Sequence, residues 1–239
     1  LRGIQVEVEA VRVASREGQT VVRRSISLVL LEAAHALYPE ARLVVGQSLG
    51  GGYFYSWHGT TPLTTGVVTS LERRMRELCD EDRPIIRRTA TLEEAEALFR
   101  GNGCGAVMDI AHGPCAPSTG LLKGFALSLY EDGLLLRFPR DGDGALPALR
   151  PQPKLFAAYR ETRRWNEAVG VAHVGSLNRA CLSGEVAQVI KIAEGFHEKR
   201  IAQIADAIAA RAGQVRVVLV AGPSASGKTT FIQRLGIQL

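Results

Sequence analysis

The chain has 239 residues, of which 46% are apolar and 22% charged, a composition typical of a globular protein with one large domain or two smaller ones. No run of residues approaches the roughly 18 apolar residues that a membrane span requires, so we expect a cytoplasmic protein with no membrane partner. The net charge is +5, but the Arg pairs are dispersed among acidic residues. Nucleic acid, tRNA included, is therefore a less favoured partner than a small molecule.

The first elements are predicted from two different periodicities. Residues 4–14 alternate apolar and polar side chains, which predicts a strand, and residues 16–18 predict the turn after it. Apolar residues then recur at helical spacing over 21–38, with Ser25 as an early cap and Pro39 as the stop.

The following segments show either the apolar–polar alternation of a strand or the apolar spacing of a helix. They predict, in order, strands at 42–45 and 53–57, a helix at 65–79, a strand at 85–89 and, after a Thr91 cap, a short helix ending near residue 99. Residues 106–138 predict a strand, a turn-rich crossing at 113–120 and a hairpin that turns at 131–133. Together these elements predict an α+β module whose sheet is largely antiparallel.

Beyond this module the composition changes. Asp, Gly and Pro dominate residues 140–153, which predicts a linker. Helical spacing resumes at 157–169, and a proline-free stretch at 184–212 places apolar residues on a continuous stripe. It leads into a branched apolar run at 217–220, which predicts a strand, and then into a helix-like stretch at 230–235.

Between that strand and that helix lies a loop with the pattern G-x-x-x-x-G-K-[ST], formed by Gly222, Pro223, Ser224, Ala225, Ser226, Gly227, Lys228 and Thr229. Glycines allow successive backbone N–H groups to converge on phosphate oxygens, and the following helix presents its positive end to the same anion. We expect Lys228 to reach the β and γ phosphates of ATP as the catalytic cation, Thr229 to coordinate Mg²⁺, and Thr230 to complete the site. A Gly/Ser-rich linker that matches the pattern by accident is the alternative.

Phosphoryl transfer needs more than a phosphate loop. It also requires an acidic residue on another strand to hold the metal, a group that positions the acceptor, and a lid. Residues 232–239 are too few to supply these parts. We therefore expect the sequence to contain the beginning of a kinase domain, with the rest beyond Leu239, and no kinase activity from this segment alone.

The motif "AGPSASGKTTF" resembles the opening of the uridine kinase and phosphoribulokinase branch of P-loop kinases, over residues 215–239. This resemblance implies ATP-dependent phosphorylation of a nucleoside or sugar hydroxyl. The implied partners are a nucleotide and a nucleoside-type small molecule.

A different family is indicated upstream. The segments "RRSISLVLLEAAHALYPEARLVVGQSLGGGYFYSW" and "AHGPCAPSTGLLKGFALS" resemble the second additional domain of threonyl- and alanyl-tRNA synthetases, which edits mischarged tRNA. Together with the kinase motif, they resemble a bacterial fusion of a synthetase-like region with a nucleoside or uridine kinase. The implied domains are 1–20 (end of a TGS-like domain), 21–139 (editing-like domain), 140–156 (linker), 157–213 (helical connector) and 214–239 (truncated P-loop kinase domain).

In the synthetases the editing domain binds metal through an H-x-x-x-H on its first helix and a Cys and a His around a GP turn. By position, these four ligands fall here on Leu28, Glu32, Ala111 and Cys115. Only two of the four residues can bind a metal, whereas zinc normally takes three or four protein ligands. We therefore expect no zinc, and a domain that binds a ligand without catalysis or serves as a scaffold.

The alternative is a metal-dependent aminoacyl-tRNA editing hydrolase with altered ligands, in which neighbouring histidines replace the lost ones. The candidate pocket consists of Glu32, His35, Tyr53, Tyr55, His112, Cys115, Ser118 and Thr119. The remaining histidines, His58, His173 and His197, are expected to be ordinary core or surface residues.

Overall fold

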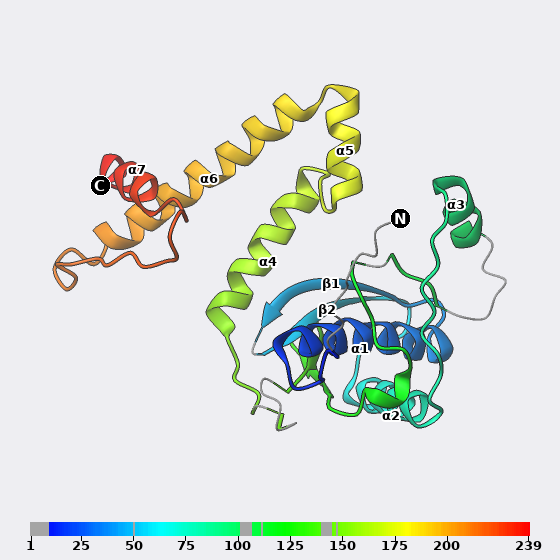
Figure 1. The fold of residues 1–239 in the computed structure, drawn as a ribbon. Helices are drawn as coiled ribbons and strands as arrows, with labels where there is room; N and C mark the ends of the chain where they lie inside the picture. Colours follow the sequence, from blue (N-terminus) through cyan, green and yellow to red (C-terminus); the bar gives the residue numbers. More distant parts are fainter. Residues whose placement is uncertain (1–9, 50, 101–106, 111, 140–144, 147) are drawn as a thin grey trace, which may run out of the picture. The chain divides into compact units, whose positions relative to one another are not determined.

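The computed structural model describes residues 10–49, 51–100, 107–110, 112–139, 145–146 and 148–239. They form two compact units, Leu1–Gln152 and Pro153–Leu239, and each is described by itself. The first unit has helices on an antiparallel sheet, which confirms the predicted α+β class, and the second contains only helices among its elements (Figure 1). No helix in the described part of the chain is both long and apolar enough to cross a membrane.

The first helix, α1, spans Arg16–Leu37 and begins earlier than predicted. Its N-cap is Ser15, not Ser25, because the Ser15 Oγ accepts the N–H of Gly18 at 3.0 Å. Residues 16–18, predicted as a turn, therefore form the first turn of the helix. A glycine is required at position 18, since an added Cβ would lie 1.9 Å from the Arg12 carbonyl oxygen.

Four strands form one antiparallel sheet in the order β1-β2-β4-β3. Their bounds are Arg42–Leu49 (β1), Gly52–His58 (β2), Ala126–Tyr130 (β3) and Gly133–Arg137 (β4). The register places Tyr55 opposite Leu134 and Phe54 opposite Leu135. The predicted hairpin is confirmed, because β3 and β4 pair directly across the two residues between them.

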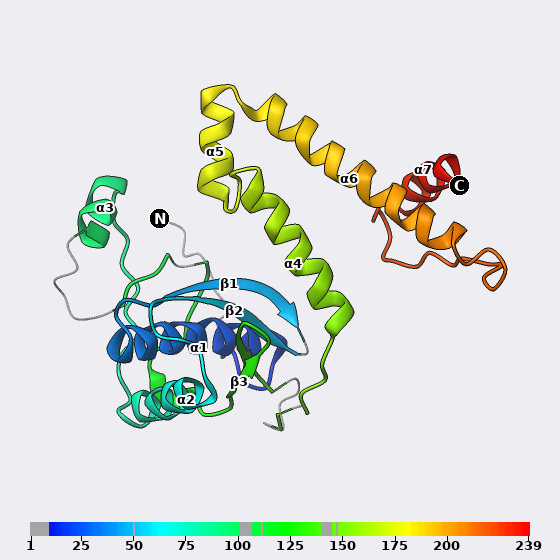
Figure 2. The same ribbon diagram turned by 180° about the vertical axis from the view of Figure 1, so that it is seen from behind.

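Two helices cover one face of this sheet. The second, α2 (Thr65–Asp80), packs beside α1, and Figures 1 and 2 show the pair as one layer against the strands. The buried positions of each helix recur at three- and four-residue spacing, as expected for a helix with one apolar face. They meet the inward side chains of Tyr55, Leu134 and Leu136 in a single core.

A shorter helix, α3, spans Leu92–Arg100, as predicted from the Thr91 cap. The Thr91 Oγ1 accepts the Glu94 N–H at 3.2 Å, and the Glu94 carboxylate accepts the Thr91 N–H at 2.8 Å. This reciprocal pair is a capping box, which satisfies two backbone donors at the helix start. A single 3₁₀ turn, η1 (Thr119–Leu121), precedes β3.

Several predicted strands are wrong. Residues 10–14, 85–89, 107–110 and 217–220 form no strand, and residues 1–9 lie outside the described part. A strand requires a neighbour for its backbone hydrogen bonds, and an apolar run alone does not supply one. Near 85–89 the only pairing among described residues is an isolated bridge between Pro84 and Ser118.

The second unit contains α4 (Pro153–Ala168), α5 (Val174–Ser183), α6 (Val186–Ala209) and α7 (Lys228–Gln238). Of these, α5 was not predicted. It is delimited by a capping box between His173 and Ser176 and by Gly184, whose φ of +81° ends the helix. The core between α6 and α7 is small, and its fully buried residues are Ile201, Ala205 and Leu235.

Replacing Leu30 with Ala is expected to lower the free energy of unfolding of the first unit by about 2–5 kcal/mol, because the side chain is 0% exposed in the core. The matched control is Leu37→Ala in the same helix, where the side chain is 38% exposed and a change within about 0.5 kcal/mol is expected. Urea unfolding should be followed by Trp57 fluorescence in a Trp165→Phe background, since these are the two tryptophans of the chain. Equal losses in the two variants would contradict the described packing of α1.

Candidate functional site

Two residues of the loop before α7 have a left-handed backbone conformation. Ala225 and Gly227 have φ values of +58° and +76°, and Gly227 is the residue that precedes the helix. Left-handed residues among right-handed ones allow successive N–H groups to point toward one centre. Gly222 lies close to Ser226 across the loop, because a Cβ added at Gly222 would be 3.0 Å from the Ser226 Oγ.

The backbone N–H groups of this loop form no hydrogen bond with the part of the chain that the structure describes. Residues 224–230 donate no backbone hydrogen bond to any residue that the structure describes, and the first bond of α7 runs from the Phe231 N–H to the Gly227 carbonyl at 2.9 Å. The initial N–H groups of a helix always lack intrahelical acceptors. Here the N–H groups of the loop residues before α7 also lack acceptors among the described residues. An anion is the ligand that such a set of donors favours.

The side chains of the motif are arranged around the same loop. The Lys228 Nζ donates to the Pro223 carbonyl and, at 3.3 Å, to the Ser226 Oγ. Both acceptors belong to the loop, so the ammonium is held over it. The hydroxyls of Thr229 and Thr230 form no hydrogen bond with the described residues and are exposed.

A hollow of about 480 Å³ adjoins the loop. Its lining residues are His197, Val220, Ala221, Ser226, Gly227, Lys228, Thr230 and Phe231. The sequence analysis did not identify His197 as a site residue. The available signal was its position four residues before the buried Ile201, which places both on the face of α6 that packs against α7.

Several residues of the candidate pocket in the first unit have partners within the protein, and others are exposed. Glu32 is occupied by the protein itself, because its carboxylate accepts the Val107 N–H at 3.0 Å and lies 3.4 Å from the Arg83 guanidinium. His35 and His112 are exposed and make no hydrogen bond with described residues. The carboxylate therefore connects residues 83 and 107 to α1.

The GP turn lies against α1, as the synthetase resemblance implies. The Arg24 guanidinium donates to the Pro114 carbonyl at 2.8 Å, and the Ser25 Oγ accepts the Ala116 N–H at 2.8 Å. Cys115 is half-buried between these two contacts. Gly113 has a φ of +147°, and an added Cβ would lie 2.6 Å from the Arg24 guanidinium.

The other pocket residues have structural partners. The Tyr55 hydroxyl donates to the Ser27 Oγ at 2.8 Å, and burial raises the pKa of this phenol to about 12. The Thr119 Oγ1 donates to the Leu78 carbonyl at 2.6 Å and accepts the Arg83 N–H at 2.8 Å. A hydrogen bond from Ser118, together with one from the Gly120 N–H, lowers the pKa of Asp82. Tyr53 packs edge-on against Phe138, with ring centres 5.1 Å apart.

These positions do not fit a zinc ion. Among the described residues, no three His, Cys, Asp or Glu side chains converge on a point where a metal could bind. Leu28 is apolar, Glu32 is paired with Arg83, and Ala111 lies outside the described residues.

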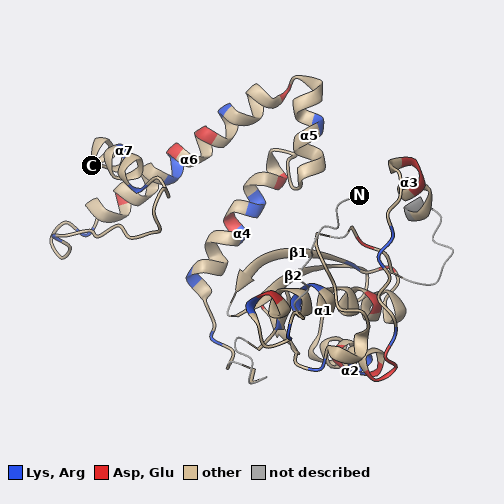
Figure 3. Cartoon of the chain, viewed as in Figure 1, with Lys and Arg blue, Asp and Glu red and all other residues tan. Residues whose placement is uncertain are grey.

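Charge is distributed unevenly between the units. Residues 153–239 contain twelve Lys and Arg against six Asp and Glu, a net charge of +6, whereas residues 1–152 carry −1. Figure 3 shows that the charged residues of the second unit are spread along α4, α5 and α6 with both signs mixed. This pattern is typical of solvated helix faces.

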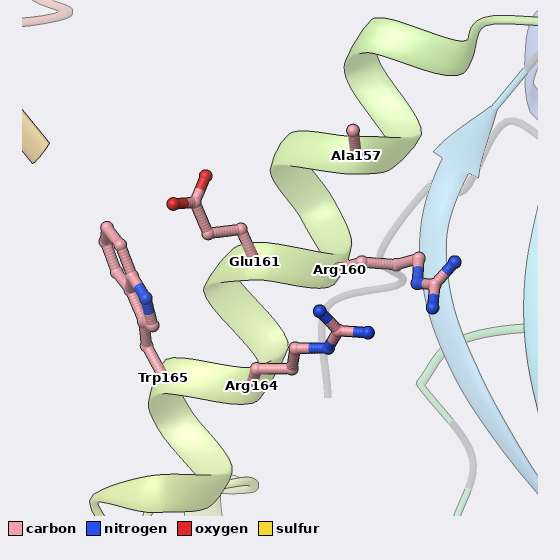
Figure 4. Close-up of a pocket in the computed structure, with 5 residues that line it drawn as sticks. All are labelled: Ala157, Arg160, Glu161, Arg164 and Trp165. Atoms are coloured by element: carbon pink, nitrogen blue, oxygen red, sulfur yellow. The ribbon is translucent and has the colours of Figure 1, made fainter. Parts of the chain in front are cut away.

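A second hollow, of about 450 Å³, lies along α4 and is lined by Ala157, Arg160, Glu161, Arg164 and Trp165. Figure 4 shows Arg160 and Arg164 extending to one side of the helix and Glu161 and Trp165 to the other. The latter two contact α6, because Glu161 pairs with Arg200 at 3.5 Å and the Trp165 ring stacks on Phe196 with centres 5.6 Å apart. Glu161 and Trp165 therefore pack α4 against α6.

About half of the chain is synthetase-like. It is 31% identical over 132 residues to a threonine–tRNA ligase of Burkholderia vietnamiensis and 32% identical over 134 residues to that of Teredinibacter turnerae. These matches cover 46% and 47% of this chain and 21% of each ligase, so the chain spans about a fifth of the length of the relatives it matches. These matches support the predicted resemblance to tRNA synthetases, and they do not support the predicted kinase. No protein-family model matches the chain.

Tyr55 provides a test of the geometry of the first unit. A tyrosine in an unfolded chain ionises near about pH 10, whereas the pKa of Tyr55 in the folded unit is about 12. The folded state therefore keeps this proton longer, and the free energy of unfolding should fall as the pH rises from about 10 to about 12. In Tyr55→Phe this fall should be shallower, as measured by urea unfolding at a series of pH values. Identical slopes would contradict the described burial of the phenol.

Proposed function

We propose that residues 222–229 bind the phosphates of a nucleoside triphosphate with Mg²⁺, as the first part of an ATP-dependent nucleoside kinase. The observation that carries this proposal is that the backbone N–H groups of residues 224–230 donate to no described residue, in a loop that leads into α7 and accepts a hydrogen bond from the Lys228 ammonium. The similarity to threonine–tRNA ligases does not extend to this activity. The proposal therefore depends on the loop alone.

Each residue of the loop has a separate role. Backbone N–H groups hold the phosphate oxygens, and Lys228 exchanges its contacts with the Pro223 carbonyl and the Ser226 Oγ for contacts with the β and γ phosphates. Thr229 has an exposed hydroxyl in the first turn of α7, where it would hold the Mg²⁺ ion. The nucleotide supplies the phosphoryl group, and the chain's contribution is to bind and orient it.

Lys228→Ala is expected to weaken binding of Mg²⁺·ATP by about 10-fold or more, because a charge-assisted contact to phosphate is lost. Isothermal titration of the 239-residue chain measures this change. The matched control is Lys191→Ala, an exposed lysine of α6 in the same unit, which should bind as the unaltered chain does. In a longer protein that phosphorylates nucleosides, the same change should lower kcat by about 10²-fold or more. Unchanged affinity and turnover would refute the kinase proposal.

The second candidate function is hydrolysis of an aminoacyl-tRNA by the first unit. The comparisons favour it over the kinase, because the relatives found are threonine–tRNA ligases, whose names refer to threonine and tRNA. The contact between α1 and the GP turn also agrees with the arrangement implied by the editing-domain resemblance. tRNA and aminoacylated nucleotides are the partners that this similarity supports.

The side chains of the first unit favour binding without metal chemistry. Glu32 already has a cation and an N–H donor, and Leu28 has no donor atom. Hydrolysis would require Arg83 to release this carboxylate and the exposed His35 and His112 to move in beside it. We therefore propose that the unit binds a ligand related to those of the synthetases and does not hydrolyse it.

Elemental analysis of protein purified without added metal is expected to find less than one zinc per chain, and seryl- and threonyl-tRNA should remain intact in its presence. The reason is that zinc normally takes three or four protein ligands, and here two ligand positions are Leu28 and Ala111. The decisive variant is Cys115→Ser, with the exposed Cys181→Ser as the matched control. Stoichiometric zinc and hydrolysis that are both lost in Cys115→Ser, but kept in the control, would establish the hydrolase instead.

A further inference from the structure

We propose that His197, which lies outside the phosphate-loop motif, donates a hydrogen bond from its imidazole to the phosphate chain of the bound nucleotide. This inference rests on the proposed nucleotide site and adds to it a residue from α6. It assigns part of the site to the helical connector that precedes the loop.

Packing within the second unit fixes the distance between α6 and the loop. Ile201 and Ala205 of α6 are buried against Leu235 of α7, and the Glu198 carboxylate pairs with the Arg234 guanidinium at 2.7 Å. Residues four apart lie on the same helix face, so His197 continues the stripe formed by Ile201 and Ala205. Its imidazole is therefore placed on the side of α6 that faces α7 and the loop.

His197 shares one hollow with the residues expected to bind phosphate. Ser226, Gly227, Lys228 and Thr230 line the same space of about 480 Å³. Lys228 and His197 therefore border one space, although they belong to different helices, α7 and α6. A phosphate chain held by the loop would extend into the space that His197 lines.

The chemistry of the side chain suits this role. His197 is exposed, and its imidazole makes no hydrogen bond or ion pair with any residue that the structure describes. A neutral imidazole has one N–H donor and an imidazolium has two. Phosphate oxygens are strong acceptors, and hydrogen bonds to charged acceptors are about twice as strong as those between neutral groups. Val220, Ala221 and Phe231 provide no side-chain donor in this hollow, so the imidazole of His197 is the donor that α6 contributes to it.

The test uses inorganic tripolyphosphate, a ligand that contains the phosphate chain and no nucleoside. His197→Ala is expected to weaken its binding to the 239-residue chain by about 10-fold, as expected for loss of one charge-assisted hydrogen bond. His197→Gln retains an N–H donor and should recover part of the affinity, whereas His197→Phe retains only the ring shape and should not. The matched control is His173→Asn, because His173 caps α5 and Asn preserves a cap.

The outcomes separate this inference from the proposed function. If His197→Ala binds tripolyphosphate as the unaltered chain does while Lys228→Ala does not bind it, the role of His197 is refuted and the phosphate site stands. If His197→Ala weakens binding of ATP but not of tripolyphosphate, the imidazole contacts the nucleoside and the inference is also refuted. If His197→Phe binds tripolyphosphate normally, no hydrogen bond from residue 197 is needed, which refutes the inference as well. Failure of the unaltered chain to bind either ligand would refute both. Circular dichroism of each variant confirms that the helices remain folded.

Discussion

The buried hydroxyl of Ser25 holds the first unit together at the place where its candidate pocket lies. It donates to the Val21 carbonyl within α1 and accepts the N–H of Ala116 in the segment that follows the GP turn. Both bonds measure 2.8 Å, and the side chain is 0% exposed, so neither partner can be replaced by water. The GP turn, Cys115 and the 3₁₀ turn after it take their positions relative to α1 from this bond and from the neighbouring Arg24 contact.

Hydrogen bonds and one ion pair connect several segments of the first unit to α1. Arg24 and Ser25 hold the GP turn and the residue after Cys115. Arg83 holds the 3₁₀ turn, because its guanidinium lies beside Glu32 and its backbone N–H donates to Thr119. This ion pair is partly exposed and contributes modestly to stability, so the hydrogen bonds of Ser25 and Thr119 carry more of the connection. Changes at the ligand positions are thus compatible with an intact fold.

The loop at residues 222–229 depends on a different constraint. Its donors remain available because α7 begins at Lys228 and cannot satisfy the N–H groups before its first turn. The orientation of α7 is set by contacts with α6, where Ile201, Ala205 and Leu235 form the core and Glu198 pairs with Arg234. A core of this size supplies little free energy, and the apolar residues Val217 and Leu219 before the loop are 72% and 88% exposed. The loop geometry therefore comes from local backbone conformation more than from burial.

The sequence by itself determined the elements whose signals are local. The helix at 65–79, the Thr91 cap and the hairpin turn at 131–133 were predictable because helical spacing, capping side chains and turn residues act within a few positions of one another. Only the tertiary structure decided that residues 85–89 and 217–220 form no strand, since a strand exists only where a second one donates to it. It also decided that Glu32 pairs with Arg83 and that His197 and Lys228 line the same hollow, because 51 and 31 positions of sequence separate these residues and only folding brings them together.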